Sequence, residues 1–128
     1  MGQGAARLCR VSLPKTIYRL IDASVWQRAV AAGVFLGTEH DVRDGFIHFS
    51  TAEQAAETAA RHYAGQANLL LLGVSVAALG AALRWEPSRG GALFPHLYAS
   101  LSPAAVTSVV PLALGPDGQH LMPPLDLG

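Results

Sequence analysis

The stretch "DGFIHFSTAEQ", residues 44–54, decides the fold because it predicts a strand that runs directly into a helix. Its Asp-Gly pair is a turn signal, and the apolar run behind it has the length of a short strand. Side chains alternate across a strand, so Ile47 and Phe49 share the face expected to enter the core. His48 and Ser50 share the opposite face. Two polar groups inside an apolar strand indicate a site on that face.

Two main helices are predicted from capping signals. Thr51 caps the helix that follows the opening stretch, and Gln54 completes a capping box. Ser24 and Gln27 form a second capping box, and the helix that they begin is expected to stop at Gly33. A capping role is therefore the simplest interpretation of Thr51.

Segments rich in β-branched and aromatic residues predict about six short strands, which with two helices indicate an α+β fold. The apolar run at residues 68–76 is typical of a strand buried on both faces. Pro95 cannot donate to a central ladder, so we expect its strand at a sheet edge. The predicted strands are residues 16–20, 46–50, 68–76, 83–86, 93–98 and 106–112.

The chain is expected to form one domain, residues 16–112, between two tails. The N-terminal tail is residues 1–15, and the Gly- and Pro-rich C-terminal tail is residues 113–128. Residues 34–45 are expected to be mostly loop, with a short strand at their start. Their "EHD" segment is the most polar part of the chain, and we expect it to be solvated.

Composition narrows the class of protein. Of the 128 residues, 51% are hydrophobic and only 14% are charged, against about 25% charged in an average domain, so a sizeable core is expected. The formal net charge of zero argues against strong nucleic-acid binding and against recruitment to a charged membrane surface. The single cysteine, Cys9, allows no intrachain disulfide, and the cytoplasm is the simplest compartment. No apolar stretch approaches the roughly 18 residues of a membrane span.

Four predicted strands carry polar residues near their centres. Burying such a group without a partner costs roughly 1–3 kcal/mol, more if the group is charged. These side chains therefore face solvent, satisfy one another, or line a pocket. They are Arg19, His48, Ser50, Glu86, His96 and Tyr98.

An ion pair and a metal site are two simpler roles that stay open for these side chains. Arg19 and Glu86 could form an ordinary surface ion pair, worth about 0–1 kcal/mol. His48, His96 and Glu86 could ligate a metal ion, but their spacing is not diagnostic, and we expect no metal. The sequence contains none of the zincin, CxxC, Rossmann or P-loop motifs.

The motifs "IYR", "GFIHFSTAEQ", "LLLLGV", "LRWE" and "LFPHLY", in this order and spacing, resemble a bacterial family catalogued as domain of unknown function 952. The resemblance covers roughly residues 16–112, and it is specific because "GFIHFST" and "FPHLY" together are unusual. Members of that family more often carry histidine where this chain has Arg19.

That family is grouped by fold with ADP-ribosyltransferases. The resemblance implies a split, mixed or antiparallel β-sheet that clasps a bent NAD molecule. It implies that Arg19 contacts the ribose or phosphate, and that His48, Ser50 and Thr51 support the nicotinamide pocket. It also matches Glu86 to the glutamate that stabilises the oxocarbenium-like transition state in that fold.

The leading hypothesis is a cytoplasmic NAD- or nucleotide-binding protein with ADP-ribosyltransferase- or phosphotransferase-like activity. Arg84 stands where arginine-modifying enzymes of that fold carry a second glutamate, which argues against protein-arginine modification. A non-catalytic small-ligand or protein-interaction module is the alternative, and a metal-dependent hydrolase is the third hypothesis. The expected catalytic residues are Glu86 and His48, and the expected ligand contacts are Arg19, Ser50, Thr51, His96 and Tyr98.

Overall fold

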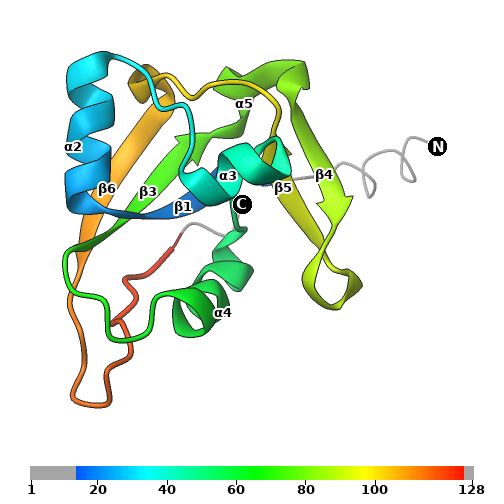
Figure 1. Ribbon diagram of the computed structural model, residues 1–128. Helices are drawn as coiled ribbons and strands as arrows, with labels where there is room; N and C mark the ends of the chain where they lie inside the picture. The colour runs from blue at the N-terminus through cyan, green and yellow to red at the C-terminus, as the bar shows by residue number, and fades with distance from the viewer. Residues whose placement is uncertain (1–13, 126–128) are drawn as a thin grey trace.

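The computed structural model describes residues 14–125 and shows an α+β fold with six strands in two three-stranded antiparallel sheets. The first sheet has the order β1-β3-β6 and the second β2-β5-β4. Figure 1 shows the β4–β5 hairpin to one side of the first sheet, with α3 between this hairpin and α2. The strands are β1 (Thr16–Asp22), β2 (Ile47–His48), β3 (Leu69–Ser75), β4 (Leu83–Pro87), β5 (Leu93–Leu97) and β6 (Val106–Leu112). The helices are α2 (Ala23–Ala32), α3 (Glu39–Asp44), α4 (Ala52–His62) and α5 (Val76–Leu79), with 3-10 turns η1 (Gly80–Ala82), η2 (Arg89–Gly91) and η3 (Pro103–Ala105).

The two sheets meet where β1 passes the end of β2. Tyr18 and Ser50 exchange both backbone hydrogen bonds there, each with an N–O distance of 2.8 Å. This bridge fixes the chain that runs from β2 into α4 against the middle of β1. The prediction of about six strands in an α+β fold is confirmed, and the strands form two antiparallel sheets.

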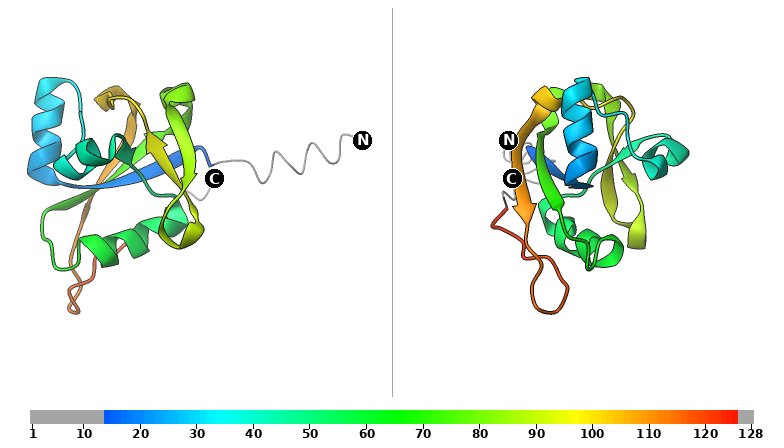
Figure 2. Two further views of the ribbon diagram at one scale, coloured as in Figure 1. Left: turned by 45° about the vertical axis from the view of Figure 1, so that its right-hand side comes forward. Right: turned by 60° about the vertical axis from the view of Figure 1, so that its left-hand side comes forward.

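Strands β1 and β3 of the first sheet are buried on both faces. Alternate β1 residues enter two separate hydrophobic clusters. Ile17 and Ile21 belong to the first cluster, and Leu20 belongs to the second. Helix α2 contributes to the first cluster and α4 to the second, so the two main helices cover opposite faces, as the side views in Figure 2 illustrate. The prediction that the strand around residues 68–76 is buried on both faces is confirmed.

Three local predictions are wrong. Helix α2 begins two residues earlier than predicted, because Asp22 and not Ser24 is its N-cap. The supposed loop before the opening stretch contains α3, which Thr38 caps. Asp41 of its "EHD" segment is only 1% exposed and is not solvated.

Pro95 also lies in the central strand of its sheet and not at an edge. Its carbonyl accepts a hydrogen bond from the Phe49 amide at 3.0 Å. The N–H and C=O of one residue in an antiparallel strand point to the same neighbour, so the missing proline N–H faces the β2 side. Strand β2 ends at His48, so the N–H that proline lacks would lie beyond the paired part of β2, and no hydrogen bond of that ladder is lost.

The C-terminal segment packs on the domain as far as residue 125. The imidazole Nε2 of His120 lies 2.7 Å from the carbonyl oxygen of Gln66. Met122 and Leu125 pack against the second hydrophobic cluster. Residues 1–13, most of the predicted N-terminal tail, and residues 126–128 lie outside the described residues. Among the described helices, none combines the length and apolar composition needed to span a bilayer.

Candidate functional site

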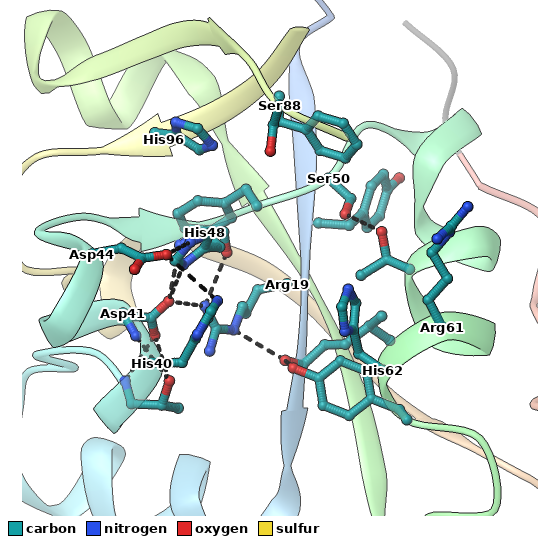
Figure 3. Close-up of a pocket in the computed structure, with 17 residues that line it drawn as sticks. Arg19, His40, Asp41, Asp44, His48, Ser50, Arg61, His62, Ser88 and His96 are labelled. Atoms are coloured by element: carbon teal, nitrogen blue, oxygen red, sulfur yellow. Dashed lines mark hydrogen bonds and ion pairs between the residues drawn. The ribbon is translucent and has the colours of Figure 1, made fainter. Parts of the chain in front are cut away.

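A cavity of about 580 Å³ opens beside the junction of the two sheets. Its walls come from the middle of β1, from α3 and β2, from the last turn of α4, and from β5. Figure 3 shows the side chains of α3 and β2 on one side of the hollow and those of α4 on the other. Titratable side chains dominate its polar lining, namely Arg19, His40, Asp41, Asp44, His48, Arg61, His62 and His96.

Asp41 is the buried centre of one wall. Its Oδ1 accepts hydrogen bonds from Arg19 Nη1 at 2.8 Å and from His48 Nδ1 at 2.7 Å. Its Oδ2 accepts from the Thr38 amide at 2.7 Å and from the Thr38 hydroxyl at 3.0 Å. Burial raises the pKa of Asp41, but the hydrogen bonds from His48 and Arg19 and the charge of Arg19 outweigh it, and the pKa lies well below its ordinary value. The carboxylate is therefore ionised and fully partnered.

Arg19 joins β1 to β2 beneath the cavity. Besides Asp41, it donates to the carbonyl oxygens of His48 and Leu20, both at 3.0 Å. These three acceptors explain why an arginine can lie in the middle of a buried strand, because they satisfy the N–H groups of its guanidinium. The guanidinium is the internal counter-ion of Asp41, and Arg19 also lines the cavity.

His48 lies between two carboxylates. Its Nδ1 faces Asp41 at 2.7 Å and its Nε2 faces Asp44 at 2.9 Å. Carboxylates only accept hydrogen bonds, so both contacts are hydrogen bonds when the ring carries two N–H groups, that is, as imidazolium. The ring also stacks on His40, with ring centroids 4.6 Å apart. The two carboxylates and His40 fix the orientation of the His48 ring at the cavity wall.

Ser50 presents a buried hydroxyl to the cavity. The Thr58 hydroxyl donates to the carbonyl oxygen of Gln54 at 3.0 Å, and Ser50 Oγ lies 3.0 Å from the same Thr58 oxygen. Because a hydroxyl has one hydrogen, Ser50 is the donor in its contact with Thr58. Its oxygen keeps lone pairs for a donor on a ligand.

His96 lines the cavity from β5. Its Nδ1 lies 2.7 Å from Glu86 Oε1, and the Tyr98 hydroxyl donates to the same oxygen at 2.8 Å. These two hydrogen bonds lower the pKa of Glu86, and the bond to Glu86 raises the pKa of Tyr98. Phe46 stacks on the imidazole with centroids 3.9 Å apart. The ring is held by a carboxylate at Nδ1, and Nε2 makes no hydrogen bond with any residue in the range 14–125.

Comparison with protein families gives a match over most of the described residues. A family model described as "Protein of unknown function (DUF952)" matches residues 20–109. The chain belongs to the DUF952 family. The matched span contains Asp41, His48 and His96, while Arg19 lies one residue before it.

Solved structures of a similar protein share the fold. A crystal structure of protein CC0527 from Caulobacter crescentus is 49% identical, with a TM-score of 0.80 over 83% of this chain and 93% of that chain. A crystal structure of a double mutant of CC0527 gives 48% identity and the same TM-score and coverage. The solution structure of CC0527 is 50% identical, with a TM-score of 0.75 over 81% of this chain and 90% of that chain. No curated protein matches the chain.

The structure brings four of the predicted site residues of this DUF952 protein into one cavity lining: Arg19, His48, Ser50 and His96. The other three lie elsewhere. Thr51 caps α4 and Glu86 stands behind His96, while Tyr98 borders a second hollow beside β2 and β5.

The sequence pattern does not reveal the α3 side of the cavity or its α4 side. It predicts a solvated loop at Asp41, although Thr38 and Asp41 have the spacing of a capping box. Arg61 and His62 lie in the last turn of α4, and nothing in their spacing indicates that they also line a cavity. The structure also does not bring His48, His96 and Glu86, the metal-ligand set considered from sequence, together at metal-ligand spacing. Among the described residues, the cluster with metal-ligand spacing is His40, Asp44 and His48.

Proposed function

We propose that this DUF952 protein binds a phosphate-bearing small molecule of nucleotide size in the cavity. The observation that carries the proposal is the excess of nitrogen-bearing side chains, two guanidiniums and four imidazoles, over carboxylates in the lining. The nitrogen-bearing side chains are Arg19, His40, His48, Arg61, His62 and His96. The lining has two carboxylates, Asp41 and Asp44. One of these, Asp41, is already neutralised by Arg19. The volume of about 580 Å³ falls within the range of about 300–1,000 Å³ that is usual for small-molecule sites.

Arg61 is the side chain best placed to grip a phosphate from α4. It lies in the last turn of the helix, and its side chain is 54% exposed. Only its Nε is used in the contact with Glu57, at 3.1 Å. A guanidinium can bind phosphate oxygens through two parallel N–H groups, which gives geometry as well as affinity. His62 and His48 place imidazole nitrogens on either side of the hollow.

NAD is the first candidate ligand. Support comes from the split sheet, from an arginine on the first strand, and from a serine at the end of a strand that leads into a helix. These are the features that the resemblance to ADP-ribosyltransferases implied. Ser50 supplies an acceptor for an amide or hydroxyl donor within the same lining.

Proton transfer is the chemistry that the site supports best if the ligand is turned over. Glu86 holds His96 at Nδ1, so that ring can accept a proton from a hydroxyl or water at Nε2. Glu86 then acts through His96 and does not touch the ligand. This arrangement favours a phosphotransferase- or hydrolase-like step over glycosyl transfer at a carboxylate, and a binding module without turnover is the alternative.

Calorimetric titration of the full chain with NAD, ADP-ribose and AMP tests the binding. Removing a charged hydrogen bond costs about 1.5–3 kcal/mol, so Arg61→Ala is expected to weaken binding by roughly ten- to hundredfold. Arg28→Ala is the matched control, because Arg28 is exposed on α2 and is not among the cavity-lining residues. Equal affinity of the two variants, or no binding of any phosphate compound, would refute the proposal.

Chromatography of the same mixtures separates an enzyme from a binding module. Nicotinamide or phosphate release that is lost in His96→Ala supports catalysis. Tight binding with unchanged ligand supports the module.

A further inference from the structure

We propose that His40, Asp44 and His48 bind a divalent transition-metal ion at the rim of the cavity. One ligand atom from each side chain lies within 4.8 Å of the other two. His48 Nε2 is 2.9 Å from Asp44 Oδ2, and His40 Nε2 is 3.6 Å from the same oxygen. Metal–ligand bonds of about 2.0–2.2 Å place neighbouring atoms of a tetrahedral site about 3.3 Å apart. Both measured edges are close to that spacing.

The local fold explains why the three side chains converge. His40 and Asp44 are four residues apart on α3, so they project from the same face of the helix. Gly45 ends the helix in a left-handed conformation, with φ 90°, and turns the chain directly into β2. The third ligand, His48, therefore comes back over the C-terminal turn of α3. Its stacking on His40 shows that the two imidazoles already share one side.

His48 has the outer partner that metal-binding histidines usually have. Its Nδ1 donates to buried Asp41, which fixes the ring and leaves Nε2 as the ligand atom. Arg19 balances the charge of Asp41, so this partner remains a carboxylate. A bound ion needs the lone pair of His48 Nε2, so it would displace any proton that this nitrogen shares with Asp44.

The donor set selects the kind of ion. Two imidazole nitrogens and one carboxylate oxygen suit Zn²⁺, Co²⁺ or Ni²⁺, whereas Mg²⁺ and Ca²⁺ prefer oxygen ligands alone. Three protein ligands leave a coordination position for water or for a ligand. All three residues line the cavity, so a phosphate held there can reach the ion.

Arg43 opposes the ion in the present arrangement. Its Nη2 lies 2.6 Å from His40 Nδ1, which must accept that hydrogen bond and therefore leaves the ring proton on Nε2. The Arg43 side chain is 68% exposed, so it can leave His40 without unpacking the core. Removing this arginine is accordingly expected to strengthen metal binding.

The test uses the untagged full chain, freed of metal by chelation and titrated with Co²⁺ and Zn²⁺ in the absence of nucleotide. We expect one ion per chain and a visible Co²⁺ absorption band. His40→Ala and Asp44→Ala are expected to weaken binding at least about tenfold, because each removes a direct ligand where even outer-shell changes cost that much. Arg43→Ala should bind more tightly, and His62→Ala, which removes a cavity imidazole outside the cluster, should bind as the wild type does.

Two results would overturn the site: no stoichiometric uptake by the wild type, or uptake that His40→Ala and Asp44→Ala leave intact. Circular dichroism checks that these variants fold, which their exposed positions favour. The metal titration contains no phosphate compound, so its failure is independent of the nucleotide-binding result.

Discussion

Oε1 of Glu86 lies 2.7 Å from Nδ1 of His96, and Phe46 stacks on the same ring with centroids 3.9 Å apart. The His96 ring, which lines the cavity, is thus held by a hydrogen bond at Nδ1 and by stacking on one face. Glu86 and His96 come from neighbouring antiparallel strands, where Arg84 is the residue directly opposite His96. Glu86 is two residues beyond Arg84 on the same strand, so its contact with His96 is a diagonal cross-strand contact.

Stability below neutral pH should depend on this contact. Hydrogen bonds from His96 and Tyr98, with the nearby charge of Arg84, lower the pKa of Glu86 from its ordinary 4.5. A lowered carboxyl pKa adds stability that is full above pH 4.5 and is lost as the pH falls through the folded-state pKa. Urea unfolding of wild type and Glu86→Gln from pH 7 to pH 3 measures this. We expect the difference in unfolding free energy between the two proteins to shrink on acidification, and a constant difference would contradict it.

Asp41→Ala is expected to cost about 3–5 kcal/mol of stability, because it leaves the Arg19 charge buried without its partner. Replacing both residues by apolar ones, Arg19→Met with Asp41→Leu, should cost less than the sum of the single changes. Denaturant unfolding of all four proteins completes the double-mutant cycle. Additive losses would show that the two side chains do not interact across the fold.

The sequence predicts the parts of this site that strand periodicity controls. Alternation alone separates Ile47 and Phe49 from His48 and Ser50, and the structure buries the first pair in the core cluster. It cannot predict Asp41, because a buried aspartate is stable only with partners such as Arg19, which is 22 residues away. Likewise, polar residues at mid-strand show that a partner or pocket exists, but not that Glu86 would turn to His96 and away from the cavity.

Helix starts show the same limit on a smaller scale. Asp22 and Ser24 are both good N-cap residues, and a capping box favours Ser24 on sequence alone. The Asp22 carboxylate accepts from the Ser24 amide at 2.8 Å and from its hydroxyl at 2.6 Å. Strand β1 ends at Asp22, so tertiary pairing decides between two locally acceptable caps.

This choice of cap is testable by two alanine substitutions. Asp22→Ala removes the side chain that caps α2 and should destabilise the protein by about 0.5–2 kcal/mol. Ser24→Ala removes only a hydroxyl that donates to the cap, so its loss should be smaller. Thermal and denaturant unfolding compare the two variants. A larger loss for Ser24→Ala would restore the serine as the cap.

Gly45 controls how α3 delivers His48 to the cavity. Its backbone has φ 90° and ψ 10°, a left-handed conformation that costs an ordinary side chain roughly 1–2 kcal/mol. A Cβ at this position would meet no atom within 4 Å, so Gly45→Ala tests backbone strain without a steric clash. Asparagine tolerates this conformation better than alanine, and Gly45→Asn should therefore be the more stable variant. Denaturant unfolding ranks the three proteins, and equal stability of wild type and Gly45→Ala would mean that the turn between α3 and β2 does not require glycine.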